Sequence, residues 1–289
     1  MQIAVLGSPR SWYLGDLRRA AQGRHVITSA AFGQLASQLD AKGFTASAGP
    51  CDLRQMDAVL VRSMPPGSLE QVVFRMDILN RLQDVGTMVV NPPRALEAAV
   101  DKYLASARLR AAGLLIPRTI ACQTVADAVD AFATLGGDVV VKPLFGSEGR
   151  GIARVNDEAV AQRVFATLAR LQSVLYLQEY VPHHGYDLRL LLIGERVLGM
   201  KRSNHADWRT NVARGAQAEP LTPSDEMIRM AQRAAEAVQA PLAGVDLLPG
   251  RDGRLYTLEV NAVPGWRALS AALQVDVATI VLEYLETVR

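Results

Sequence analysis

The feature that most constrains the fold is a two-stranded segment near the C-terminus, residues 243–261 (AGVDLLPGRDGRLYTLEVN). Its turn is predicted near residues 250–253. Side chains along a strand alternate between two faces. One face of the second strand is therefore predicted to be apolar. The other is predicted to end in two oxygen-bearing side chains before the strand stops at Pro264-Gly265. The two predicted sets are Leu255, Thr257, Glu259 and Asn261 on one face and Tyr256, Leu258 and Val260 on the other.

Asp246 in the first strand falls close to opposite Glu259 in the second, within about a residue of register. Directly opposed side chains have Cβ atoms roughly 5 Å apart. Two carboxylates at that distance repel each other unless one takes up a proton or a cation lies between them. Magnesium prefers such oxygen ligands, and the amide of Asn261 fits the set. The alternative is that Asp246 caps a strand end and Glu259 lies on a solvated face.

Composition excludes several classes of function. The 289 residues carry 31 Lys+Arg against 29 Asp+Glu, and this net charge of +2 is too small to indicate a nucleic-acid or membrane partner. No segment reaches the roughly 18 apolar residues of a membrane span, and the N-terminus lacks a basic leader, so a cytoplasmic protein is predicted. Cys51 and Cys122 have no metal-type spacing and are interpreted as inert thiols.

The first 92 residues are predicted to form a small parallel α/β domain that ends at Asn91-Pro92-Pro93. The first strand is followed by GSPR, which matches neither a dinucleotide-binding fingerprint nor a P-loop. Beyond this domain, helices are predicted over residues 94–116, over 124–135 and from 222 onward. Residues 187–202 are predicted to form a hairpin that turns at Gly194-Glu195.

A glycine-rich turn follows a buried strand that ends in Lys142. Glycines allow backbone N–H groups to approach an anion closely, and a lysine beside them can bind phosphate as a point charge. The same pattern is also that of an ordinary turn. The predicted loop residues are Gly146, Ser147, Gly149 and Gly151.

Four weaker signals occur along the chain in a definite order. Lys102 begins a helix, which alone indicates only a surface lysine, and Gln178 to Val181 end a buried strand, where they could bind a purine edge and a ribose. Asp187 begins the next strand. A basic connection, either solvated or able to stabilise developing negative charge, then places together Lys201, Arg202, Arg209, Asn211 and Arg214. His183, His184 and His205 lack a metal-ligand pattern.

Taken in order, DK at 101–102, VVVKPLFGSEGRGI, QEYV, D-x-R at 187–189, WRTNVARG, GVD at 244–246 and LEVNAVPG resemble the ATP-grasp ligases, and most closely the RimK-like α-L-glutamate ligases. The resemblance covers about residues 90–280. It implies an α/β (α+β ATP-grasp) fold in which two subdomains clasp ATP behind a small N-terminal domain. The implied boundaries are 1–92, 93–180 for the central subdomain with its glycine-rich lid, and 181–289 for the subdomain with the magnesium site.

The resemblance also implies roles for individual residues. Lys102 and Lys142 would bind ATP phosphates beneath the lid, and Arg209 and Asn211 would face the transferring phosphate. Further ATP contacts would come from Gln178, Glu179, Tyr180, Val181, Asp187 and Lys201. Magnesium, as two ions that manganese can replace, would be held by Asp246, Glu259 and Asn261.

The substrate region departs from the expected pattern. Trp266-Arg267 follows the metal strand, where it is interpreted either as a stacking-and-clamping site for a flat or anionic substrate or as plain packing. Residues 62–71, which begin with Arg62, look somewhat like the corresponding part of glutathione synthetases, whose acceptor is a small peptide. Arg189 and Arg214 are further substrate candidates.

The implied reaction is an ATP- and magnesium-dependent carboxylate–amine ligation through an acyl phosphate, attaching glutamate to a small carboxylate-bearing acceptor. It requires no protein nucleophile, and the sequence offers no Ser-His-Asp or Cys-His arrangement. The alternatives are a glutamate ligase acting on ribosomal or other protein C-termini and a non-catalytic ATP-binding regulatory module. Related ligases imply a dimer or tetramer, and no nucleic-acid or membrane partner is expected.

Overall fold

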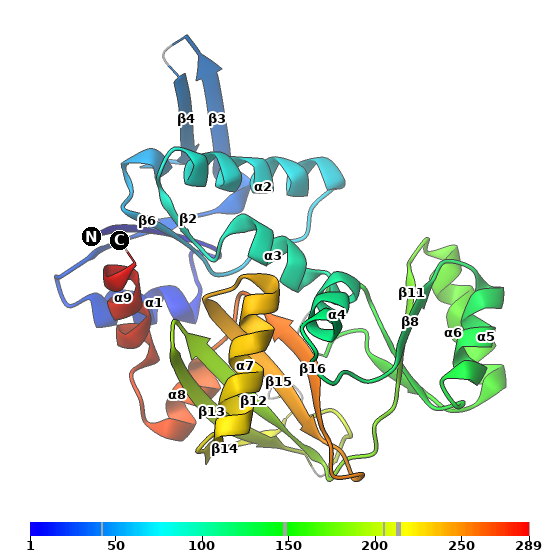
Figure 1. The fold of residues 1–289 in the computed structure, drawn as a ribbon. Helices are drawn as coiled ribbons and strands as arrows, with labels where there is room; N and C mark the ends of the chain where they lie inside the picture. The colour runs from blue at the N-terminus through cyan, green and yellow to red at the C-terminus, as the bar shows by residue number, and fades with distance from the viewer. Residues whose placement is uncertain (42, 147–148, 205, 212–214, 289) are drawn as a thin grey trace.

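The computed structural model describes residues 1–41, 43–146, 149–204, 206–211 and 215–288. These residues form four sheets (Figure 1). The segments around the parallel sheet, the central antiparallel sheet and the C-terminal antiparallel sheet are called here the N-terminal domain, the central subdomain and the C-terminal subdomain. The mixed α/β architecture predicted from the sequence is confirmed.

The N-terminal sheet is parallel, with strand order β2-β1-β6-β7. Its strands are β1 (Gln2–Leu6), β2 (Val26–Ala30), β6 (Ala58–Val61) and β7 (Met88–Val90). Alternate residues of β1 enter two different cores, because α2 (Leu69–Asp84) covers one face and α1 (Trp12–Ala21) the other. Such double coverage explains why these strands read as continuous apolar runs.

A second, antiparallel sheet inserted in this domain projects away from the body of the molecule (Figure 1). It consists of β3 (Leu35–Asp40), β4 (Gly43–Ala48) and the short β5 (Cys51–Asp52), flanked by two 3₁₀ turns, Phe32–Gln34 and Leu53–Gln55. The sequence analysis did not predict this hairpin, whose first strand is almost entirely exposed.

Two helices, α3 (Pro93–Val100) and α4 (Lys102–Ala111), replace the single helix predicted over 94–116. The break is at Asp101, whose carboxylate accepts hydrogen bonds from the N–H groups of Tyr103 and Leu104. An aspartate that caps a new helix in this way terminates the preceding one.

Asn91 joins the N-terminal domain to the C-terminal sheet. Its fully buried amide donates to the carbonyl oxygens of Leu242 and Ala262, and its Oδ1 accepts from the Leu242 N–H at 3.0 Å. The end of β7 is therefore fixed to the first residue of β15 and to the residue that follows β16, both much later in the chain.

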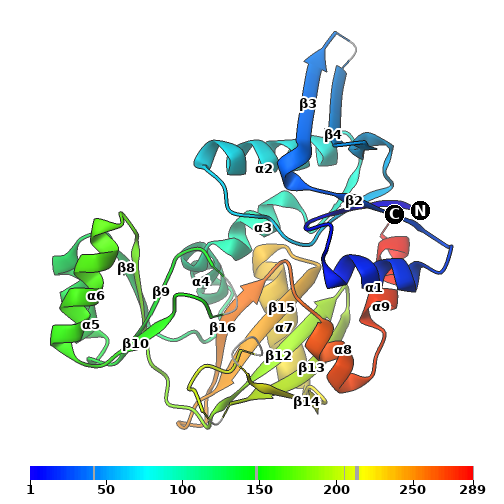
Figure 2. The ribbon, with the colours of Figure 1, turned by 180° about the vertical axis from the view of Figure 1, so that it is seen from behind.

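The central sheet is antiparallel, with order β10-β9-β11-β8. Its strands are β8 (Thr119–Cys122), β9 (Val139–Lys142), β10 (Ala153–Val155) and β11 (Leu175–Glu179). Helices α5 (Val125–Thr134) and α6 (Glu158–Arg170) pack on it, with Phe132 and Phe165 edge to face in their shared core. Figure 2 shows this subdomain standing beside the C-terminal sheet.

The C-terminal sheet is antiparallel, with order β14-β13-β12-β15-β16. Its strands are β12 (Tyr186–Ile193), β13 (Arg196–Ser203), β14 (Gln217–Leu221), β15 (Leu242–Pro249) and β16 (Leu255–Asn261). Ile193 pairs with Arg196, which confirms the hairpin turn at Gly194-Glu195. Helix α7 (Asp225–Val238) packs on one face through buried alanines, as its spacing predicted.

The chain ends with α8 (Arg267–Leu273) and α9 (Val277–Thr287), which pack with α1 and the far end of the C-terminal sheet. Within the described residues, no single helix combines the length and apolar character needed to cross a membrane. Among these residues, the pair α8 and α9 has the length and apolar composition of a membrane span when the two helices are taken together, but a bend of 110° separates them.

Candidate active site

A cleft lies between the central and C-terminal sheets, and it collects residues that the sequence analysis had placed in six separate motifs. Its walls come from the ends of β9 and β11, from the connection after β13, and from β12, β15 and β16. The predicted site residues that line it are Lys142, Gln178, Glu179, Tyr180, Val181, Asp187, Arg209, Asn211, Asp246 and Glu259.

The floor of the cleft carries the two predicted metal-binding carboxylates. Asp246 pairs directly with Glu259 across β15 and β16, and Asn261 follows two residues later on the same face. The predicted register between the two strands is therefore confirmed.

A β-bulge next to this pair corrects the predicted alternation of β16. Asp246 pairs with Glu259 but Leu247 pairs with Thr257, so Leu258 is the extra residue. Thr257 is consequently fully buried instead of sharing the face of Glu259, and Leu258 lines the cleft. An inserted residue shifts the period-two pattern by one position, which the amino-acid sequence alone does not reveal.

Two arginines hold Asp246 and its neighbour Asp187 in place. Arg189 donates to Asp246 at 2.7 Å, and Arg202 forms a two-pronged pair with Asp187 at 2.7 and 2.6 Å while lying 3.0 Å from Asp246. All four side chains are buried. Burial by itself would raise the pKa of Asp246, but the two guanidinium groups outweigh it and hold that pKa below its ordinary value.

Gly244 lies two residues before Asp246 on the same face of β15, and it leaves the space that the Arg189 side chain occupies. A Cβ atom at this position would overlap the Arg189 guanidinium, lying only 2.6 Å from its Cζ. The absence of a side chain at residue 244 therefore lets Arg189 lie flat against β15 and reach Asp246.

The donor set of the floor fits magnesium. It offers two carboxylates and an amide oxygen on one face, which is the kind of partial shell that Mg²⁺ completes with water and substrate phosphates. A cage of three or more His, Cys, Asp or Glu side chains is not found among the described residues. Asn261 Oδ1 also accepts a hydrogen bond from the Val263 N–H at 2.8 Å, which fixes the orientation of the amide.

The two predicted phosphate lysines lie on the same side of the cleft. Lys142 Nζ donates to Gln178 Oε1 at 2.6 Å, and Lys102 Nζ donates to the Gly146 carbonyl at 2.7 Å. Both also border a smaller recess that reaches Glu259. The glycine-rich turn is thus connected to the start of α4 by one of the lysines expected to act beneath it.

The glycine-rich turn uses backbone conformations that favour glycine. Gly146, Gly149 and Gly151 all have positive φ values. A Cβ atom on Gly149 would lie 2.5 Å from Oδ1 of Asn211, so the turn closely approaches the opposite wall. Ser147 lies outside the described residues.

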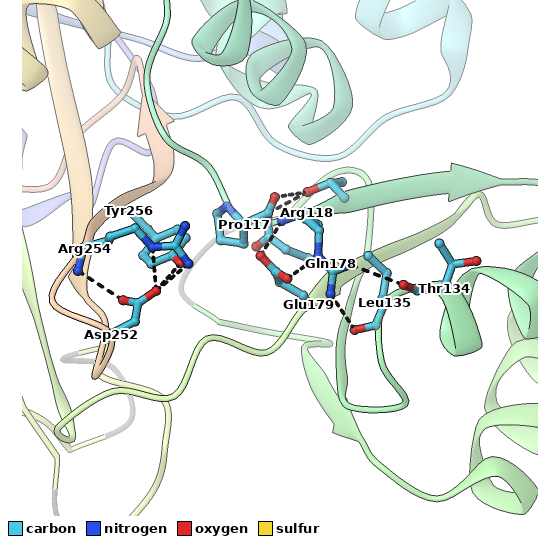
Figure 3. Close-up of polar contacts among 10 residues, drawn as sticks. Pro117, Arg118, Thr134, Leu135, Gln178, Glu179, Asp252, Arg254 and Tyr256 are labelled. Carbon is cyan, nitrogen blue, oxygen red and sulfur yellow. Dashed lines mark hydrogen bonds and ion pairs between the residues drawn. The ribbon is translucent and has the colours of Figure 1, made fainter.

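The strand end at Gln178–Val181 forms the rim. The Glu179 carboxylate accepts from the Arg118 backbone N–H at 2.8 Å and from its Nε at 2.6 Å (Figure 3). Figure 3 also shows the turn of β15–β16, where Asp252 accepts from Arg254 and Tyr256, on the other side of Pro117. The Glu179 cluster therefore lies at the rim of the cleft, and Pro117, which separates it from the Asp252 cluster, also lines the cleft.

Several lining residues were missed by the sequence analysis. Arg202, which does not itself line the cleft, was named both at the end of the predicted hairpin and in the basic connection; in the structure β13 extends to Ser203 and pairs Arg202 with Asp187. Apolar side chains from both sheets also line the cleft and can sandwich a flat ring: Val140, Ile152, Leu248 and Leu258. They resembled core positions in the sequence, and only the opposition of the two sheets distinguishes them.

The structure corrects the predicted ATP contact of Lys201. It pairs in register with Leu188, on the face of the sheet opposite to Asp187 and Arg202, because neighbouring residues of a strand point to opposite faces. Its ammonium group lies 3.4 Å from Glu219 and over the ring of Tyr186. The cleft is therefore not lined by Lys201.

The predicted stacking site at Trp266-Arg267 is also corrected. Trp266 is fully buried, and its Nε1 donates to Asp16 at 2.9 Å, so its ring is not available as a surface for a substrate. Arg267 lies against Trp12 instead. The Trp266 ring packs on Arg62, which the sequence had named separately. Arg214 lies outside the described residues.

The chain is similar to several known proteins. Residues 99–285 match the RimK-like ATP-grasp domain family. The chain is 32% identical over 270 residues to the tetrahydromethanopterin:alpha-L-glutamate ligase of Methanosarcina acetivorans, a match that covers 83% of each protein. It is 31% identical over 240 residues to the probable alpha-L-glutamate ligase of Mannheimia succiniciproducens, covering 82% of this chain and 79% of the relative.

The fold is also similar to that of a solved structure, the ATP-grasp ligase PsnB complexed with a phosphomimetic variant of its minimal precursor, Mg and ADP. The TM-score is 0.77 at 22% sequence identity, and the alignment covers 99% of this chain and 97% of that one.

Proposed function

The chain belongs to the RimK-like ATP-grasp family, an amide-forming group of ligases, and from this premise we propose that it joins L-glutamate to a small carboxylate-bearing acceptor with ATP and magnesium. The observation that carries the proposal is the direct pairing of Asp246 with Glu259, with Asn261 on the same face, on the floor of a cleft that also contains Lys142. The names of the relatives support glutamate as the amine donor.

In the proposal, the chain's own residues bind and orient the nucleotide. Val140, Ile152, Leu248 and Leu258 enclose the adenine, and Gln178 to Val181 border it. Lys102 and Lys142 bind the phosphates beneath the glycine-rich turn. Arg209 and Asn211 come from the facing wall and stabilise the transferring phosphoryl group.

Asp246, Glu259 and Asn261 would hold magnesium, as two ions that manganese can replace. When bound, the metal neutralises phosphate oxygens and so lowers the cost of bringing a carboxylate to the γ-phosphate. Arg189 and Arg202 keep Asp246 oriented for this task through the contacts already described.

The proposed chemistry has two steps. An oxygen of the acceptor carboxylate attacks the γ-phosphorus and the bond to ADP breaks, which gives an acyl phosphate. The glutamate amine then attacks the acyl carbon, inorganic phosphate leaves, and the amine proton is released, so that an amide remains. The protein supplies position and charge, and it needs no covalent nucleophile.

The proposal is tested by measuring ADP release by the purified protein with ATP, magnesium and L-glutamate. The panel of acceptors comprises pterin, deazaflavin, furan and short-peptide carboxylates, and mass spectrometry checks for a mass increase of one or more glutamates. Turnover with one acceptor identifies the substrate. ATP binding without turnover on any of them would favour the regulatory alternative, and glutamylation of a peptide alone would favour the protein C-terminus alternative.

Nucleotide binding is expected to weaken above about pH 8. Burial lowers the pKa of Lys142 to about 8, against an ordinary value of 10.5, because the charged ammonium loses solvation. Below this pH the ammonium is charged and binds phosphate. Above it, the free protein must take up a proton to bind, so the dissociation constant for ATP should rise by up to about tenfold per pH unit toward pH 10.5.

Isothermal titration at several pH values, in buffers of different ionisation enthalpy, measures both the affinity and the proton uptake. Lys142→Met is the control, since it should bind ATP weakly with no such pH dependence. A wild-type affinity that stays constant from pH 7 to pH 10 would contradict the assignment.

A further inference from the structure

Arg62 lies at a point of the N-terminal sheet where ligands commonly bind. It directly follows β6, and its backbone N–H donates to the Leu6 carbonyl at the end of β1 at 2.8 Å. From β1 the chain continues through α1 to β2 on one side, and from β6 it continues through α2 to β7 on the other. Open parallel sheets bind ligands beyond the carboxyl ends of the strands at such a reversal of direction.

The guanidinium of Arg62 is buried, and no carboxylate among the residues that the structure describes forms an ion pair with it. The residue is 5% exposed and lies between two rings, 4.8 Å from the centroid of Tyr13 and 4.2 Å from that of Trp266. Nη2 donates to the Pro264 carbonyl at 2.6 Å, but within the described part of the chain Nε and Nη1 have no hydrogen-bond partner. Burial lowers the pKa of Arg62 to about 10, so the group is still a cation at neutral pH.

Unsatisfied donors on a buried cation are unfavourable, and few structural roles explain them. Packing alone does not require a charge at this position, because an apolar side chain of similar length would fill the space between the two rings. A carboxylate supplies both the missing charge and two acceptor oxygens, in a planar arrangement that matches a guanidinium. The unpaired N–H groups therefore indicate an anionic ligand.

The position of Arg62 connects this site with the proposed reaction. Pro264, whose carbonyl it binds, is three residues beyond Asn261 of the metal strand. Tyr13 lies in the first turn of α1, whose N-terminus adds a partial positive charge to the same region. Tyr13 is half-buried whereas Trp266 is fully buried, so the Tyr13 side of Arg62 is the one nearer to solvent.

We propose that Arg62 binds the α-carboxylate of the amino acid that supplies the amine, in a subsite formed by the end of β6, the start of α1 and residues 262–266. This inference rests on the proposed function. It is specific to the amine donor, because the acceptor carboxylate must lie at the γ-phosphate, whereas the α-carboxylate of an amino acid is adjacent to its amine. Holding that carboxylate beside the end of β16 orients the amine toward the activated carbon.

The test compares Arg62→Met with Arg267→Met. Arg267 follows Trp266 in the chain and lies over the ring of Trp12, so it is a matched control for the loss of an arginine near the proposed subsite. Steady-state kinetics give KM for L-glutamate and for ATP. Arg62→Met should raise KM for glutamate by about ten- to a hundredfold, the loss expected for a charge-assisted pair, and leave KM for ATP unchanged. Arg267→Met should change neither. An unchanged KM for glutamate in Arg62→Met would overturn the subsite.

A binding measurement on the wild-type protein makes the test independent of turnover and of whether the variant folds. With magnesium and a non-hydrolysable ATP analogue, L-glutamate and L-glutamine should raise Tm, whereas L-isoglutamine, whose α-carboxylate is an amide, should not. Equal stabilisation by isoglutamine, or none by glutamate, contradicts the Arg62 proposal. Stabilisation by glutamate without turnover on any acceptor would contradict the proposed function and support the subsite.

Discussion

Glu259→Gln is expected to lower kcat by about a hundred- to a thousandfold, comparable with the loss of a group that stabilises transition-state charge, and to leave the fold intact. Glutamine has the same size and fits the same position opposite Asp246. It removes one of the two negative charges that would hold magnesium, so the metal is bound weakly and the phosphate oxygens are less neutralised. The measurement is ADP release at saturating ATP and acceptor, together with the magnesium concentration that gives half-maximal rate.

Glu219→Gln is the matched control. Glu219 lies in β14 of the same sheet, exposed and near Lys201 on the other face, so the same chemical change should leave the rate unaltered. If Glu259→Gln kept the wild-type rate at low magnesium, Glu259 would not be a ligand of the metal.

Arg202→Met is expected to destabilise the protein by about 3–5 kcal/mol. The two carboxylates that Arg202 contacts are 3% and 6% exposed, so the variant leaves Asp187 buried without its two-pronged partner and leaves Asp246 with Arg189 alone. Adding Asp187→Leu to Arg202→Met should recover most of the lost stability, because it removes the uncompensated charge. Denaturant unfolding with a common m-value measures both effects.

The control for this second experiment is Arg196→Met on the same strand. Arg196 is exposed, and its ion pair with Glu283 has a long distance of 3.5 Å, so its loss should change the free energy of unfolding by less than about 1 kcal/mol. A stability loss for Arg202→Met no larger than this would mean that water enters and solvates the two aspartates.

The sequence predicted the parts of the site that follow from local periodicity. The prediction that Asp246 lies opposite Glu259 required only the two-residue period of a strand and the position of one turn. Both can be read from the amino-acid sequence. The bulge at Leu258 was not visible, because it depends on how β16 meets its neighbour. The division of 94–116 at Asp101 could have been foreseen, since an aspartate followed by an apolar helical run is a capping signal.

Errors were larger where the structure depends on residues far apart in sequence. The Trp266 ring looked available beside Arg267, but its indole bonds to Asp16 and its face packs on Arg62, about 250 and 200 positions away. Lys201 and Arg202 illustrate a different difficulty: their order in the sequence is clear, but which of the two faces the cleft depends on the pairing register. Long-range packing and register are therefore the information that the sequence analysis lacked.

The buried amide of Asn91 has a consequence for exchanging domains between related enzymes. A chimaera joined at residue 92 would separate Asn91 from its partners at Leu242 and Ala262 unless the recipient carries equivalent backbone positions. A chimaera that takes the N-terminal domain and the C-terminal sheet from the same parent keeps all three hydrogen bonds.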